Sequence, residues 1–265
     1  MKQRSSLWAW LWAAVGAAYF VVPLVATLNF SLRAKRNSLS LAAYANVLND
    51  GRFWQAFGFS LLLALLTIIV SVTLLVPTAF WVQLRLPQLR PVVELVTLLP
   101  FVIPGIVLVF GLIKLYSGPP LPLTSSRGLL VAGYVVLALP YMYRAIDTGL
   151  RTINVRLLTE AAQSLGAGWF TIIFRIIVPN IRVAILSGAF LTLSIVIGEL
   201  ILAQYLAWPA FGPYMALVGQ DRAYEPAALA MISLALTWGA IALMQYLGRN
   251  RRREAGDQSA ELTGR

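Results

Sequence analysis

The sequence predicts an all-α protein that crosses a membrane several times, and three observations support that class. Of its 265 residues, 59% are hydrophobic and only 12% are charged, whereas soluble domains carry about a quarter charged residues. The apolar residues occur in blocks of about 20, the length that a helix needs to span a bilayer. The chain also has no cysteine and no histidine, which excludes disulfides and the commonest metal-binding and acid–base side chains.

Six blocks are long enough to span a bilayer. The first follows Lys2 and Arg4 and could be mistaken for a signal sequence, but its apolar run exceeds the roughly 7–15 residues of a secretory signal. We therefore interpret all six as transmembrane helices of a single membrane domain, residues 1–265, with no soluble domain. The predicted spans cover residues 7–28, 60–82, 92–116, 128–146, 183–208 and 227–247.

The distribution of Lys and Arg predicts the orientation. With the N-terminus inside, 14 of the 21 basic residues fall in inner segments and 7 in outer ones. Because inner loops of membrane proteins carry the excess of Lys and Arg, both termini are expected in the cytoplasm. Arg33, Lys35 and Arg36, in the first outer loop, run against the rule locally. We attribute the net charge of +11 to this bias and expect no nucleic-acid partner, because no basic stripe is interleaved with exposed aromatics.

Two of the predicted outer loops contain residues that indicate their local structure. The first, residues 29–59, is long for a simple turn, and Ser40 in it is a candidate N-cap for a short helix on the outer membrane surface. The second, residues 117–126, is rich in proline and is not expected to form a helix.

The third span contains Pro100, Pro104 and Gly105 near its middle. Each proline removes a backbone donor and strains the preceding turn, so a kink is expected. Such a kink can be a packing feature, or it can line a polar path, because irregular backbone at membrane depth is tolerated beside protein or a water-filled cavity.

Two acids fall within the predicted spans. Glu94 lies near the cytoplasmic surface and can reach water or Arg90, whereas Glu199 lies deep in the fifth span. A charge at mid-bilayer costs a few kcal/mol, so Glu199 should face the bundle interior or a cavity. It is either a structural hydrogen-bonding acid or part of the solute path. The candidate path residues are Pro104, Ser194, Gly198 and Glu199.

About 36 inner residues separate the fourth and fifth spans, far more than a tight helix connection needs. Asn154 can cap a helix over residues 155–165, and Gly166 follows where a residue with positive φ commonly ends a helix. A second helix over residues 169–177 should end at Pro179, which can open the fifth span. The apolar stripes predicted on these two helices are Val155, Leu158, Ala161, Ala162 and Leu165, and Trp169, Ile172, Ile173 and Ile176.

The surface of this hairpin could contact either of two things, a cytoplasmic partner or lipid. Small Ala161 and Ala162 would let the first helix sit deeply in a groove of a cytoplasmic partner, with Glu160 fixing its orientation. A helix that rests on lipid is the alternative, and the few bulky apolar residues, with only Arg156 as a cationic flank, speak against it.

The hairpin, residues 154–179, resembles the EAA loop of the permease subunits of bacterial ABC importers, the binding-protein-dependent type I family. That pattern is Glu-Ala-Ala, three residues, Gly, nine residues, Ile, any residue, Leu and Pro. This chain departs from it only at Val178, where the pattern has Leu. The matching residues are Glu160, Ala161, Ala162, Gly166, Ile176 and Pro179.

The resemblance implies a multi-pass subunit of the bacterial inner membrane that couples to an ATPase. Glu160, Ala161, Ala162 and Gly166 would be the coupling positions, and Ile176 and Pro179 would pack and end the second helix. The implied partners are a second permease subunit in a heterodimer, two ATPase subunits, an extracytoplasmic solute-binding protein and membrane lipid. The chain has no phosphate-binding loop. We therefore expect that it is not an enzyme and holds no metal or cofactor. ATP and Mg²⁺ are expected to bind to the partner ATPase subunits.

The wider layout resembles the spermidine/putrescine branch, so a small polar solute such as a polyamine is expected. The pair Gly198-Glu199 departs from the acidic pair expected there and looks closer to phosphonate-, iron- or sulfate-type relatives. A cation would suit Glu199 and an anion would suit the outer basic loop. An ion-coupled secondary transporter should carry more intramembrane ionisable residues and repeated halves, and the lack of His and Cys disfavours a membrane enzyme.

Overall fold

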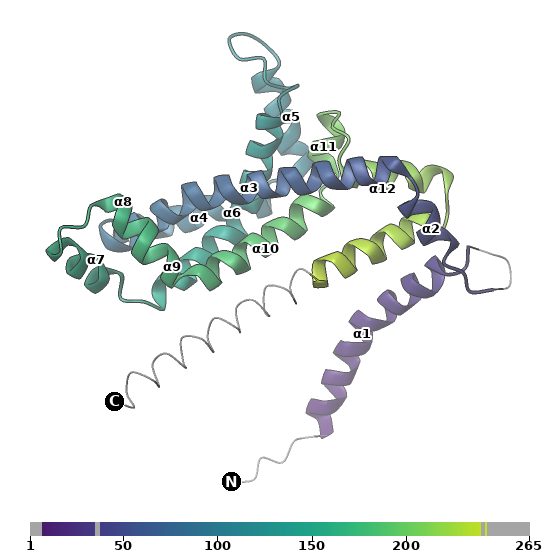
Figure 1. Cartoon of the computed structure of the whole chain (residues 1–265), viewed down its shortest axis with the longest axis horizontal. Helices are drawn as coiled ribbons and strands as arrows, with labels where there is room; N and C mark the ends of the chain where they lie inside the picture. Colours follow the sequence, from purple (N-terminus) through teal and green to yellow (C-terminus); the bar gives the residue numbers. More distant parts are fainter. Residues whose placement is uncertain (1–6, 35–37, 240–241, 243–265) are drawn as a thin grey trace. The chain divides into compact units, whose positions relative to one another are not determined.

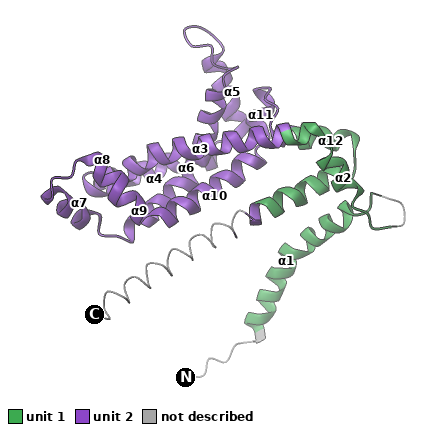
Figure 2. Ribbon diagram, in the orientation of Figure 1, with its two compact units in different colours: residues 1–54, 214–236 green, residues 55–213, 237–265 purple. Residues whose placement is uncertain are grey.

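The computed structural model describes residues 7–34, 38–239 and 242, and the regular elements among them are helical (Figure 1). The chain divides into two compact units. One comprises residues 1–54 and 214–236, and the other comprises residues 55–213 and 237–265 (Figure 2). This architecture confirms the predicted all-α class.

Three helices are long and apolar enough to cross a membrane: α1 (Leu7–Ser31), α3 (Gly51–Leu84) and α6 (Arg127–Arg151). Two further pairs of helices pass the same test together, each bent at a short break. These account for five of the six predicted spans. For the sixth, 227–247, residues 225–239 are helical, and residues 240, 241 and 243–247 lie outside the described part of the chain.

The third predicted span is not one helix. It is divided into α4 (Arg90–Val102), which follows the short turn η1 (Pro87–Leu89), and α5 (Gly105–Tyr116), with a bend of 101° between them. Ile103 is extended, with φ −88° and ψ 113°, as expected of a residue that precedes proline. The predicted kink is confirmed at Pro104 as a complete break, whereas Pro100 stays inside α4.

The fifth predicted span, 183–208, is also wrong as one continuous helix. α10 (Arg182–Gly198) ends before Glu199, which is extended, and the chain continues as α11 (Ile201–Tyr205) and α12 (Phe211–Asp221). The physical reason for this break lies in the hydrogen bonds of Glu199, described below.

Close packing of α6 against α10 forms the centre of the larger unit. A Cβ on Gly188 would lie 2.7 Å from the sulfur of Met142, and one on Gly149 would overlap the Cβ of Ala184. Such small residues let two membrane helices approach closely. At the α7 (Val155–Ser164) end, buried residues of α3, α6, α7 and η2 (Ile172–Ile177) form one hydrophobic cluster.

The second helix of the hairpin differs from its prediction. It consists of α8 (Trp169–Thr171), the π-helical turn η2 and α9 (Val178–Asn180), so it extends one residue past Pro179. Its buried residues are Ile172, Ile173 and Ile177, whereas Trp169 is 37% exposed. The wider π turn moves the next inward position from residue 176 to residue 177, because its hydrogen bonds join residues five apart.

The smaller unit contains the predicted short outer helix, α2 (Ala42–Leu48). The Ser40 hydroxyl accepts a hydrogen bond from the Ala42 N–H at 3.1 Å, but the N-cap is Leu41, so the N-cap predicted at Ser40 is wrong by one residue. The Tyr44 hydroxyl lies 2.7 Å from the Ser31 hydroxyl, which joins α2 to the end of α1.

Candidate functional site

The first helix of the hairpin, α7, is closed at both ends by local hydrogen bonds. The Asn154 side chain accepts the Leu157 N–H at 3.0 Å. At the other end, the Ala167 N–H donates to the Ala162 carbonyl at 3.0 Å and the Gly166 N–H donates to the Gln163 carbonyl at 2.9 Å. Gly166 has φ +78°, which is the left-handed residue of a Schellman motif. Both predicted caps are confirmed.

The two faces of α7 differ from the predicted single stripe. Val155, Thr159 and Ala162 are buried at 5% exposure or less and pack toward the core. Ala161 is exposed and Leu165 is 89% exposed. The prediction was wrong for Ala161 and Leu165. Positions 157, 161 and 165 are four residues apart and form a separate row on the helix. This row is rotated by about one residue from the buried row. α7 thus presents Ala161 and two leucines outward.

Glu160 lies on the exposed side of α7. Its carboxylate accepts a hydrogen bond from Arg156 Nε at 2.8 Å, and both side chains are largely exposed. This hydrogen bond, and secondarily the charge of Glu160, raises the pKa of Arg156 above its ordinary value. Exposed pairs of this kind add little to stability, so the Glu160 carboxylate can exchange Arg156 for a partner's group at small cost.

The remaining two motif residues lie on the second helix of the hairpin. Ile176 is half-buried against the hydrophobic cluster that includes Ile172 and Ile177. Pro179 is exposed in the last turn before the chain bends by 78° into α10.

The two helix breaks lie next to each other in the larger unit. A Cβ on Gly105, the first residue of α5, would lie 3.8 Å from side-chain carbons of Ile201 and Leu202 in α11. The rings of Phe110 and Tyr205 extend this contact, with centroids 5.0 Å apart. The structure therefore brings together the breaks that contain three of the predicted path residues, Pro104, Gly198 and Glu199. Ser194 lies one turn earlier, where its hydroxyl donates to the Phe190 carbonyl at 3.1 Å.

Glu199 accounts for the break between α10 and α11. Its carboxylate accepts the N–H groups of Ile201 at 2.8 Å, Leu202 at 3.0 Å and Ala203 at 3.4 Å. Unpaired amides at a helix start carry partial positive charge and stabilise a carboxylate. A Cβ on Gly212 would overlap the Glu199 carbonyl oxygen, so α12 begins directly against this turn.

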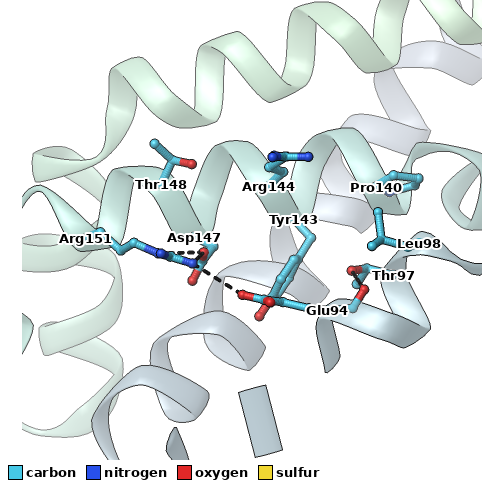
Figure 3. Close-up of a pocket in the computed structure, with 9 residues that line it drawn as sticks. All are labelled: Glu94, Thr97, Leu98, Pro140, Tyr143, Arg144, Asp147, Thr148 and Arg151. Atoms are coloured by element: carbon cyan, nitrogen blue, oxygen red, sulfur yellow. Dashed lines mark hydrogen bonds and ion pairs between the residues drawn. The ribbon is translucent and has the colours of Figure 1, made fainter. Parts of the chain in front are cut away.

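A ring of four charges joins α4 to α6, and the sequence predicted only one of its contacts. Arg90 reaches Glu94 at 3.1 Å and Asp147 at 2.9 Å. Arg151 reaches the same two acids at 3.3 Å and 2.7 Å (Figure 3). Asp147 was missed because the fourth span was predicted to end at residue 146. The signal was present in the four-residue spacings of Arg90 with Glu94 and of Asp147 with Arg151.

The ring borders a cavity of about 410 Å³ whose lining includes Thr97, Tyr143 and Thr148. The Tyr143 hydroxyl is buried there without a hydrogen-bond partner. Within the described residues, no group of three or more Asp, Glu, His or Cys side chains is placed to hold a metal ion.

Residues 76–253 match the family model described as "Binding-protein-dependent transport system inner membrane component". The chain is 32% identical over 204 residues, 72% of its length and 74% of the relative's, to a probable molybdenum ABC transporter permease protein of Haloferax volcanii. It is 26% identical, with 89% and 90% of the two chains covered, to a putative 2-aminoethylphosphonate transport system permease protein of Salmonella typhimurium. With the spermidine/putrescine transport system permease protein PotC of Escherichia coli, it shares 23% identity over 88% and 91% of the two lengths.

The fold is similar to that of a solved structure. A chain of a bacterial alginate ABC transporter, crystallised with an alginate pentasaccharide-bound periplasmic protein, superposes with a TM-score of 0.66 at 16% identity, covering 91% of this chain and 94% of that one. The family match covers most of the chain and includes the whole hairpin. The chain therefore belongs to the inner membrane components of binding-protein-dependent transport systems, and is a multi-pass permease subunit of an ABC importer.

Proposed function

We propose that this subunit forms one half of a solute path and couples it to ATP hydrolysis through the hairpin over residues 154–179. A second permease subunit in a heterodimer would supply the other half, two ATPase subunits would bind ATP and Mg²⁺ at the cytoplasmic side, and this chain would hold neither. The observation that carries the proposal is the build of α7, a capped helix fixed to the core by one face while its other face is free.

The free face of α7 has the chemistry of a docking surface. Leu157 is 60% exposed and Leu165 is 89% exposed, with the small Ala161 between them in the same row. A partner that covers this row would remove its apolar surface from water. The neighbouring Glu160 offers a charge that can orient that partner, and the buried Ala162 belongs to the hydrophobic cluster that also includes residues of α6 and α3.

An assay of the assembled transporter tests this role. Glu160→Lys should abolish uptake and the ATPase stimulation by the solute-loaded binding protein, while the variant subunit still inserts in the membrane. Gln88→Lys is the matched control, because Gln88 is an exposed polar residue of η1 in the same unit and lies outside the hairpin sequence. Full uptake by the Glu160 variant, or equal loss in both variants, would contradict the coupling role.

The outer side offers a polar surface for the binding protein. In the smaller unit, the Asn46 amide donates to Glu225 at 3.0 Å, and the Tyr214 hydroxyl donates to Asp50 at 3.2 Å. Exposed Asn49, Arg52 and Arg222 border the same hollow. We propose this cluster as the permease side of the contact, since polar, hydrated rims are typical of transient interfaces.

The cargo is a small polar solute delivered by that binding protein. Polyamine import has the support of the similarity to PotC, and import of a phosphonate or of a sulfate-type anion has the support of the molybdenum and 2-aminoethylphosphonate relatives. Ferric iron stays the third expectation.

A further inference from the structure

We propose that an anion-accepting site, centred on Arg144 of α6, lies on the solute path, so that the cargo is a small oxyanion and not a polyamine. This inference rests on the proposed function and adds the charge class of the solute.

Arg144 lies in an open hollow formed by α4, α6 and α10. The hollow has a volume of about 480 Å³, and its lining includes Phe101, Tyr141, Thr148 and Ser187. It adjoins the cavity beside the charge ring, and both are lined by Leu98, Pro140, Arg144 and Thr148. Of the described residues that line the hollow, Arg144 is the one that carries a charge.

The Arg144 guanidinium has no partner within the described chain. Arg90 and Arg151 neutralise Glu94 and Asp147 in the charge ring, and no hydrogen bond or ion pair joins Arg144 to any described group. Figure 3 shows Arg144 and Thr148 on one side of α6, pointing away from both acids. The positive charge of Arg144 is therefore uncompensated.

The position of Arg144 in the membrane limits what it can face. It lies seven residues before the end of α6 at Arg151, which is about 10 Å along the helix axis at 1.5 Å per residue. The predicted span ends at residue 146, so Arg144 lies toward the cytoplasmic end of the span, where a water-filled hollow open to that side can reach it. An importer must pass its solute through the membrane, so a water-filled hollow beside Arg144 fits the path.

Two hydroxyls complete the site. Tyr141, Arg144 and Thr148 are three and four residues apart and so share one face of α6, and the hydroxyls of Tyr141 and Thr148, like Arg144, have no hydrogen-bond partner among the described residues. A guanidinium binds an oxyanion through two parallel hydrogen bonds, and the hydroxyls can donate to its remaining oxygens. A polyamine would instead meet a like charge with no free carboxylate to offset it.

Uptake by the whole transporter, reconstituted with its binding protein in liposomes, tests the site. The probes are molybdate, sulfate, phosphate, 2-aminoethylphosphonate, spermidine and putrescine. We expect ATP-dependent uptake of one of the anions. Arg144→Gln should lower that uptake at least about tenfold, as expected for loss of a charged hydrogen bond, while the binding protein still stimulates the ATPase. Arg144→Lys should recover part of the rate.

Two further variants make the test decisive. Thr148→Val keeps the volume of the side chain and should weaken the apparent affinity for the anion several-fold, even if Arg144→Gln proves unstable. Arg85→Gln, at an exposed arginine directly after α3, should leave uptake unchanged.

Several outcomes would overturn the site and leave the importer function intact. The first is uptake of spermidine or putrescine by the wild type. The second is unchanged anion uptake in Arg144→Gln, or unchanged affinity for the anion in Thr148→Val. The third is loss of the second permease subunit from the Arg144→Gln complex, which would assign Arg144 to subunit pairing. Import of none of the six solutes by the wild type would overturn the oxyanion cargo but not the coupling role of the hairpin, which Glu160→Lys tests separately.

Discussion

At the scale of single residues, the positions that matter most have local causes. Asn154 and Gly166 could be predicted because a cap depends on a few neighbouring residues and on backbone geometry that few residue types adopt. Glu199 could be recognised only as a costly charge. Its carboxylate accepts the amides of Ile201 and Leu202 because α10 ends just before it. The preceding Gly198 is only a weak sequence signal for that helix end.

Gly166 supports a prediction about backbone conformation alone. A Cβ at Gly166 would meet no atom within 4 Å, so the cost of substitution comes only from its φ of +78°. Gly166→Val should lower the free energy of unfolding by about 1–2 kcal/mol, and Gly166→Asn should cost less because Asn tolerates positive φ. Thermal unfolding of the purified subunit measures both. Equal stability of the Val and Asn variants would contradict this explanation.

Gly212 supports a second prediction, this time about space. A methyl group there would overlap the backbone of Glu199, so Gly212→Ala should cost about 1–3 kcal/mol, the usual cost of overpacking. Gly111→Ala is the control, because a Cβ at Gly111 meets nothing within 4 Å and alanine is the better helix former. The free energy of unfolding in detergent should be lower for Gly212→Ala than for Gly111→Ala. An unchanged free energy of unfolding for Gly212→Ala would show that α12 does not depend on this contact.

At the scale of helices, length and apolar character could be predicted, but continuity could not. The break at Pro104 had a signal in the proline itself. The break at Glu199 had only the weak signal of Gly198, and the π turn at Ile172–Ile177 had none, because periodicity analysis assumes one helical repeat throughout. That assumption also placed Ile176, and not Ile177, on the buried stripe.

The link between α4 and α6 supports a prediction at this scale. Asp147 receives both Arg90 and Arg151, and its side chain is 12% exposed, whereas that of Glu94 is 43% exposed. Asp147→Asn should therefore lower the free energy of unfolding by about 1–3 kcal/mol, since two arginines lose a partly buried charge partner. Glu94→Gln, in the same ring, should cost less than about 1 kcal/mol. Chemical unfolding of both variants measures the difference, and a larger effect at Glu94 would contradict the burial argument.

At the scale of the whole molecule, the family could be recognised from about 20 residues, because Glu160, Gly166 and Pro179 have a fixed spacing on a hairpin between two spans. The cargo could not be predicted in the same way. Arg144 was counted only as an inner basic residue, since its unpaired state depends on how α4, α6 and α10 pack together, and no local pattern encodes that packing.

The orientation in the membrane yields a prediction that the composition makes easy to test. The chain has no cysteine, so a single introduced thiol reports one position. With the hairpin in the cytoplasm, Ser164→Cys should react with a membrane-impermeant maleimide in inside-out vesicles only, and Asn49→Cys should react in right-side-out vesicles only. Both positions are exposed. The reverse pattern would invert the topology.

The hairpin is joined to the membrane helices by two connections of different build. Toward α6, only Thr152, Ile153 and Asn154 separate the two helices, and the charge ring braces α6 against α4. Toward α10, the chain passes through the wide π turn and then bends by 78°. In the proposed coupling, a displacement of α7 would reach α6 across three residues and would reach α10 through the buried η2 turn. The two helices that pack together at the centre of the larger unit, one of which carries Arg144, would therefore both be moved from one surface.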